Sequence, residues 1–513
     1  MLEDLLADIG QSFFSLIIDE STMVDAKKVL CLMVRYFSQK EAKICTRFYK
    51  LLELESGSAE AMTAAIVGQL QENKLDLAKL IGIGIDGANA MAGQNNSVSS
   101  KLTDMNPELV TIKCLCHSLH LCAEKACDKL PRVLDTLVKE SHAWFSRSTS
   151  RNIKYAKLFE VMCEKRPKKI SKLSGTRWLA RLDAIETILE QWTELRLHFG
   201  DALNERGDAG YKAEVLSKMF EAHENKLYLV FLRHALKKTI SVNKAFQSES
   251  ADPFKLLQDL NELLYQSLQS IVVPQQLEKA LNKDLFKFDF KKFLMPAECV
   301  NFGYEFNSQS KICKPAELGI IKQRCRDFLI KLCEEIQARV PKNIAVLEKI
   351  NYFSRENACQ GNKLDILDLA VAFGSVCGDI DATINEWNML HRLNFECGNT
   401  EEFWAKVMEM TDANGDAKFQ HISKLAVALL CLPFSNASVE RAFSMANIVK
   451  DKLRNKMSIK TADAIMRVRF SLAEGCVNFV PTPKMLENFD NEHVYKSDFD
   501  TEVLDAFNAP TDQ

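Results

Sequence analysis

Residues 80–89 have the sequence Leu80-Ile81-Gly82-Ile83-Gly84-Ile85-Asp86-Gly87-Ala88-Asn89, a short apolar run that ends in an acid. The stretch Phe13-Phe14-Ser15-Leu16-Ile17-Ile18-Asp19-Glu20-Ser21-Thr22 follows the same plan. Runs of this length that are rich in isoleucine are typical of buried strands. If the two strands are neighbours, Asp19 and Asp86 lie at the rim of one sheet. Each aspartate taken alone is equally well explained as the cap of a loop or helix.

A third carboxylate stands far along the chain, in Ser435-Asn436-Ala437-Ser438-Val439-Glu440-Arg441-Ala442-Phe443-Ser444. The polar residues at its start predict the beginning of a helix. Val439, Ala442, Phe443 and Ala446 fall on one face of that helix, so Glu440 points to a different side. Glu440 can therefore be a favourable charge in a first helical turn. It can also join two strand-end aspartates in a site for paired divalent cations, the arrangement used for phosphoryl transfer.

Four blocks of the chain resemble, in order, the catalytic body of hAT-superfamily DNA transposases. They are the segment around Asp19, Ile85–Met91, Cys114-Leu115-Cys116-His117 and Leu432–Ser444, and a Thr176-Arg177-Trp178 segment between them also resembles the family. The resemblance implies an RNase H-like nuclease core in which Asp19, Asp86 and Glu440 form the acidic triad. In an active enzyme these acids hold Mg²⁺ or Mn²⁺ and cleave and transfer DNA strands. Many relatives carry an acid where this chain has Met23, a position outside the triad.

The same resemblance allows a second function. A protein derived from such a transposase can keep the fold and the dimerisation surface, and bind DNA or protein, without cleaving DNA. No Cys-x-x-Cys with a His pair precedes Asp19. We therefore expect the BED-type zinc finger of full-length relatives to be missing from this chain, which leaves the recognition of transposon ends open.

Composition limits the class of protein. The 513 residues are 47% apolar and 26% charged, which is ordinary for a globular protein of several domains. The net charge of −3 provides no overall positive field, so contact with DNA must come from local patches. The sixteen cysteines are scattered and follow no secretory segment, which favours reduced thiols inside the cell. We expect a nuclear protein with DNA as partner, a homodimer or higher oligomer, no membrane contact and no small-molecule cofactor.

The spacing of apolar residues predicts an α/β part followed by a helical part. We predict strands at Ser12–Ile18, Lys28–Phe37, Ile44–Leu51, Leu80–Ile85 and Val110–Cys114, a helix near Ala59–Glu72 and a helix or turn from Ala88. After about Cys116 the apolar spacing is helical, as in Ala180–Phe199, Tyr211–Ser241, Pro253–Val273 and Ile320–Arg339. The predicted fold class is α/β plus all-α: an RNase H-like mixed β-sheet core, interrupted by a large helical insertion and completed by C-terminal helices.

This pattern predicts four regions. Residues 1–120 hold the first part of the core, 121–425 the helical insertion, and 426–483 the hAT C-terminal region with the dimerisation surface. Residues 484–513 contain eight acids against two lysines, which predicts a disordered acidic tail. Within the C-terminal part we expect Thr400 to cap a helix, Leu425–Leu432 to be buried within the monomer, and the helix of Phe443 to continue towards Leu453.

The Cys114-x-x-His117 pair has the spacing of half a zinc site. A second ligand pair at similar spacing is missing from the sequence, and the pair also suits the start of a packed helix. The resemblance makes Cys114 and His117 a recurring structural feature of the core.

Basic residues predict where DNA binds. They are Lys165, Arg166, Lys168, Lys169 and Lys172, followed by Arg177 and Trp178. The cations can neutralise phosphates, and Trp178 can stack on an unpaired base. In hAT transposases a tryptophan at a comparable place is linked to handling of the flanking-DNA hairpin. The alternative is a solvated charge run and a core tryptophan. A second basic segment, from Lys450 to Lys456, faces either DNA or solvent.

Overall fold

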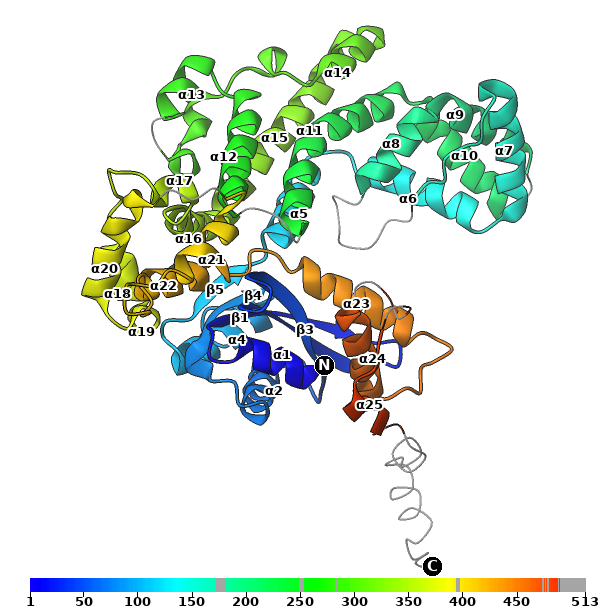
Figure 1. Cartoon of the computed structure of the whole chain (residues 1–513). Helices are drawn as coiled ribbons and strands as arrows, with labels where there is room; N and C mark the ends of the chain where they lie inside the picture. The colour runs from blue at the N-terminus through cyan, green and yellow to red at the C-terminus, as the bar shows by residue number, and fades with distance from the viewer. Residues whose placement is uncertain are drawn as a thin grey trace, which may run out of the picture.

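The computed structural model describes residues 1–171, 181–205, 207–248, 253–281, 284–393 and 397–472, together with 475, 477, 479–487 and 489. The chain is a mixed α/β protein in which helices predominate (Figure 1). Among the described residues, none of the helices is both long enough and apolar enough to cross a bilayer. The predicted acidic tail lies almost wholly outside the described residues, apart from 484–487 and 489.

Five strands form one sheet near the N-terminus. Its order is β3-β2-β1-β4-β5, with β1 at Phe14–Thr22, β2 at Lys28–Ser38, β3 at Lys43–Leu54, β4 at Leu80–Ile85 and β5 at Val110–Lys113. β1, β2 and β3 form an antiparallel meander, whereas β1, β4 and β5 run parallel. A parallel neighbour requires a crossover, which α2 (Ala59–Glu72) provides between β3 and β4. The predicted mixed sheet is thus present, and each predicted strand lies within a few residues of an observed one.

Helices cover both faces of the sheet because its side chains alternate along the strands. On one face Leu16 and Ile18 pack in the cluster that includes residues of α1 (Leu2–Ile9), α2 and α4 (Val98–Met105). On the other face Ile17 packs with α23 (Ala437–Val449) and α24 (Ile459–Ser471). Figure 1 shows these two C-terminal helices, in orange, beside the blue strands. Helices from the far end of the chain therefore complete the core.

Helices make up the middle of the chain, and their buried side chains belong to one large cluster that includes Leu119, Leu236 and Phe328. α5 and α15 pack against each other, and α11 packs against α5, α12 and α15. The α-helices outside the core layers are α3 Asn89–Ala92, α5 Leu115–Cys127, α6 Val133–Ser146, α7 Thr149–Cys163, α8 Leu182–Glu190, α9 Trp192–Asp201, α10 Asp208–Glu221, α11 His223–Gln247, α12 Pro253–Gln269, α13 Pro274–Leu281, α14 Tyr304–Gln309, α15 Pro315–Arg339, α16 Pro341–Asn351, α17 Arg355–Ala358, α18 Leu367–Ala372, α19 Gly374–Cys377, α20 Ile380–Met389, α21 Thr400–Met408, α22 Gln420–Leu430 and α25 Pro483–Glu487.

Three details of the C-terminal part are settled by these bounds. Leu425–Leu432 is buried within the monomer, as predicted, since each side chain is at most 8% exposed. The prediction that Thr400 caps α21 is wrong, because Asn399 Oδ1 accepts the Glu402 N–H at 2.8 Å and Thr400 is already helical. α23 ends at Val449, short of Leu453. The predicted regional boundaries stay predictions, and residue 425 lies inside α22.

Candidate active site

The register of two parallel strands sets the position of the two aspartates. Ile17 of β1 is the partner of Gly84 of β4. Continued by two residues, this register places Asp19 beside Asp86. β1 does not end at Asp19, contrary to the pattern of the apolar run, because β2 keeps pairing with it as far as Thr22. β4 does end just before Asp86. The two acids thus lie at the edge of the parallel part of the sheet.

Side-chain alternation decides which face the acids share. Ile17 belongs to the cluster on the α23 side, so Asp19, two residues further on, projects to the same side. Asp86 stands two residues after Gly84. A Cβ on Gly84 would lie 3.0 Å from Cβ and Cγ of Pro433, so the segment that leads into α23 passes directly over this face. The helix that carries Glu440 therefore begins on the side to which the aspartates point.

Glycine in β4 has a reason that the sequence alone did not show. A Cβ on Gly82 would lie only 2.5 Å from Leu432 Cδ2 and 2.7 Å from Ser15 Oγ. Gly82 and Gly84 together leave room for the backbone and side chains of Leu432 and Pro433. The spacing of the two glycines was the available signal for this close approach.

Cys114 connects the sheet to two helices. Its N–H donates to Ile85 O at 2.8 Å, which continues the β4–β5 pairing. Its buried sulfur accepts the N–H of His117 at 3.5 Å and of Asn436 at 3.3 Å, from the starts of α5 and α23. The Cys116 thiol also donates to this sulfur, and chiefly for that reason the pKa of Cys114 is lowered. Cys114 therefore helps to hold α23, and with it Glu440, against the sheet.

Further hydrogen bonds fix the start of α23. Asn436 Nδ2 donates to Ile18 O at 3.4 Å, and Leu115 N donates to Phe434 O at 3.3 Å. The side chain of Asn436 is thus used to reach β1, and the Ala437 N–H is bound by Ser435 Oγ at 3.1 Å. The predicted helix start is correct to within two residues.

The three acids interact electrostatically. The pKa of Asp19 is raised from 3.8 to about 7, first because the carboxyl is buried and then by the negative charge of Asp86, with a smaller contribution from Glu440. Opposing this, a backbone N–H bond from Glu20 favours the charged form. Burial is thus the main cause of the shift, and the negative charges of Asp86 and Glu440 add to it.

The acids are not drawn together tightly. Among the described residues, no three side chains of His, Cys, Asp or Glu are gathered closely enough to hold a metal ion as they stand. Asp86 Oδ1 accepts the Ala88 N–H at 3.0 Å, so one of the two carboxylate oxygens of Asp86 already binds its own loop. The donor set itself, three carboxylates from two adjacent strands and one helix, has the hard oxygen ligands that Mg²⁺ and Mn²⁺ prefer. The same finding leaves Cys114 and His117 without a described zinc site.

His117 lies next to the acids, a position that the Cys114-x-x-His117 motif did not predict. Its Cδ2 lies 3.6 Å from the point where a Cβ on Gly87 would stand, directly after Asp86. The half-buried imidazole of His117 is therefore held next to the acidic rim by the first turn of α5.

The predicted DNA-contact residues are only partly described. Lys172, Arg177 and Trp178 lie outside the described residues. Lys168 and Lys169 are exposed, and Lys168 pairs with Glu190 at 2.6 Å. In the second basic segment Lys450 faces neither DNA nor solvent. It is buried, and its Nζ donates to Asp25 Oδ2 at 2.7 Å and to Met457 O at 2.6 Å.

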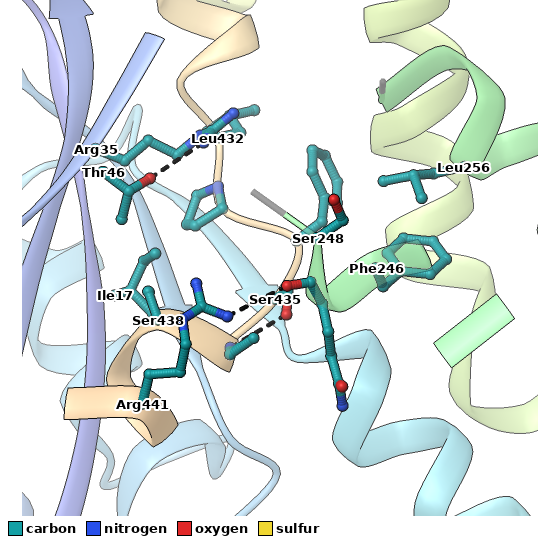
Figure 2. Close-up of a pocket in the computed structure, with 14 residues that line it drawn as sticks. Ile17, Arg35, Thr46, Phe246, Ser248, Leu256, Leu432, Ser435, Ser438 and Arg441 are labelled. Atoms are coloured by element: carbon teal, nitrogen blue, oxygen red, sulfur yellow. Dashed lines mark hydrogen bonds between the residues drawn. The ribbon is translucent and has the colours of Figure 1, made fainter. Parts of the chain in front are cut away.

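A cavity lies where the helical insertion meets the core beside this site. Figure 2 shows it between Ile17 of β1, Ser435 and Ser438 of the α23 start, and Phe246 and Ser248 at the end of α11. Arg441 of α23 reaches across it, and its Nη1 donates to Gln247 O at 3.3 Å. The end of α11 is thereby tied to the helix that bears Glu440.

Two family models match the chain, one at each end. Residues 1–97 match the RNase-like domain described for ZMYM1/FAM200. Residues 399–472 match the hAT family C-terminal dimerisation region. The first match covers β1 and β4 with Asp19 and Asp86, and the second covers α23 with Glu440. Together, the RNase-like match at the N-terminal end and the hAT dimerisation match at the C-terminal end are consistent with a hAT-type transposase or a domesticated derivative of one.

Proposed function

We propose that this protein cleaves and transfers DNA strands with Asp19, Asp86 and Glu440 as metal-binding carboxylates. The observation that carries the proposal is the parallel register of β1 and β4, which sets Asp19 beside Asp86 on the side where α23 begins. The raised pKa of Asp19 supports it, because the charges of both other acids act on that carboxyl.

Each residue has a distinct part in this proposal. Asp19 and Asp86, on neighbouring strands, would each supply carboxylate oxygens to a divalent-cation site. Glu440 of α23 would supply the third carboxylate. Mg²⁺ or Mn²⁺ bound there would polarise the scissile phosphate and make water or a 3′-hydroxyl a better nucleophile at neutral pH. Cys114 and Asn436 keep the α23 start on the sheet, and so keep Glu440 in reach. His117, beside Gly87, is in position to donate a hydrogen bond at the same rim.

A second candidate function rests on the open spacing of the acids. Since no described group of three ligands is ready for a metal ion, the chain can equally act as a nuclear DNA- or protein-binding dimer that no longer cleaves DNA. The match to a dimerisation region supports self-association under either function.

Nicking of supercoiled plasmid separates the two candidates. The purified chain is incubated with plasmid in Mg²⁺, in Mn²⁺ and in EDTA, and Asp86→Asn is compared with Asp104→Asn, which changes an exposed acid on α4. We expect divalent-metal-dependent nicking by the unaltered chain and by Asp104→Asn, and a loss of at least about 100-fold in Asp86→Asn. Nicking that survives in Asp86→Asn would come from another source and would refute the triad. A chain that binds DNA but never nicks it favours the second candidate.

A further inference from the structure

One helix of the insertion presents an exposed basic face. Between His234 and Lys244, the exposed residues of α11 recur at intervals of three and four, so they lie on one side of the helix. The opposite side is buried, with Leu232, Leu236, Ile240 and Phe246 in the insertion core. We name this face the α11 basic stripe; its members are His234, Lys237, Lys238, Ser241 and Lys244.

Within the described residues, the charge of the stripe is not neutralised by a paired acid. Across the described part of the chain, no carboxylate forms an ion pair with Lys237, Lys238 or Lys244, and the nearby Glu305 is paired with Arg233. Glu186 is the other acid beside this end of the stripe. The pKa of His234 is lowered below 6.5, first because its imidazole is partly covered and then by the positive charges of Lys238 and Lys237. In a chain of net charge −3 this is a local concentration of positive charge.

The stripe leads to the candidate active site. From His234 to Lys244 a helix rises about 15 Å, and three residues after Lys244 the carbonyl of Gln247 receives the hydrogen bond from Arg441. Asn243 O also lies 3.7 Å from Cys116 Sγ, so the end of α11 contacts the core at two points. In Figure 1, α11 runs from the α8–α10 group towards the core, and Figure 2 shows its end facing Ser435 and Ser438.

We propose that the α11 basic stripe binds the phosphate backbone of duplex DNA and guides the duplex to the acids of the core. This inference rests on the proposed function, which makes DNA the substrate. Lysines on a rigid helix face bind phosphates as point charges without regard to sequence. Duplex DNA carries one charge per about 1.7 Å of its axis, so a stripe of this length can meet several phosphates. The stripe contains no Phe, Tyr or Trp on which unpaired bases would stack, which favours a duplex over a single strand.

Salt dependence of binding tests the stripe. The affinity of the full chain for a fluorescent 30-base-pair DNA is measured by anisotropy over a series of KCl concentrations. The variant K237A/K238A/K244A is compared with K212A/K311A/K349A, which removes three exposed lysines from α10, the turn after α14, and α16. Those three also lack an ion pair among the described residues. All six positions are exposed, so the thermal unfolding of both variants should match that of the unaltered chain.

Each lysine that neutralises a phosphate contributes about 0.9 to the slope of log affinity against log salt. We therefore expect the slope of the stripe variant to fall by about 2.7, and that of the control variant to stay within about 0.5 of the unaltered chain. Equal slopes for the two variants would refute DNA binding by the α11 basic stripe. Tighter binding to duplex RNA than to duplex DNA of the same length would also refute it. Metal-dependent nicking with equal slopes would refute the stripe alone. A stripe-dependent slope without any nicking would refute the catalytic function and leave the stripe standing.

Discussion

Replacement of Asp19 by asparagine should stabilise the metal-free protein at alkaline pH. The pKa of Asp19 is raised from 3.8 to about 7, largely because the carboxyl is buried and faces Asp86. A raised carboxyl pKa means that the folded state holds a proton that the unfolded state has released. Ionisation of Asp19 therefore does not lower the free energy of unfolding below about pH 4. It lowers it increasingly as the pH rises, and the full loss is reached above about pH 7.

The size of this effect follows from the shift. About three pKa units at 1.36 kcal/mol each correspond to about 4 kcal/mol, an upper figure because water entry and rotation of Asp86 relieve part of the repulsion. For a domain of roughly 150–250 residues, 1 kcal/mol changes Tm by about 2–4 °C. We expect Asp19→Asn to raise the Tm of the unfolding transition of the core by about 5–10 °C at pH 8, and to leave it nearly unchanged at pH 4.

Differential scanning calorimetry at pH 4, 6 and 8 measures the change, with Asp104→Asn as the exposed control. The unaltered chain should gain stability from Mg²⁺ or Mn²⁺ at pH 8, since a cation neutralises the same repulsion, and Asp19→Asn should gain much less. A variant that is less stable than the unaltered chain at pH 8, or equally affected at pH 4 and pH 8, would show that Asp19 is not held in a repulsive cluster.

The remaining predictions concern packing, a buried histidine and self-association. Gly84→Ala should lower the free energy of unfolding by about 1–3 kcal/mol and reduce nicking, because the new Cβ displaces the segment before α23. Its control is Gly68→Ala, in open space on α2, which should raise the free energy of unfolding by up to about 1 kcal/mol and leave nicking unchanged. Burial lowers the pKa of His198 to about 4, because the folded protein favours the neutral imidazole. The free energy of unfolding should therefore fall by up to about 3 kcal/mol as the pH drops from about 6.5 towards 4. His198→Gln should flatten this pH dependence in denaturant titrations. Ile448→Ser, at a 62% exposed position on α23, should weaken the dimer in analytical ultracentrifugation, whereas Ile320→Ser, 61% exposed on α15, should not; an unaltered chain that stays monomeric at micromolar concentration would refute the dimer itself.

The elements of the core were predictable from the sequence, since their signals are local. Isoleucine-rich runs, glycine spacing and helical periods depend on residues a few positions apart, and they located the strands and α2 closely. The apolar pattern also identified Leu425–Leu432 as buried, because an all-apolar helix has no polar face to present to water. Where local signals were ambiguous, residues that the pattern did not single out take part: Asn399 instead of Thr400 caps α21, and Asp25 pairs with Lys450.

The candidate site was decided by the tertiary structure. The sequence supplied three acids and an order of blocks, but the proximity of Asp19 to Asp86 is a property of the β1–β4 register, which backbone hydrogen bonds between distant segments determine. Glu440 reaches the same side only because Gly82 and Gly84 admit Leu432 and Pro433 against the sheet. The position of the α11 basic stripe likewise depends on the packing of α11 beside α23. Such relations arise from packing and long-range pairing, which no short window of sequence encodes.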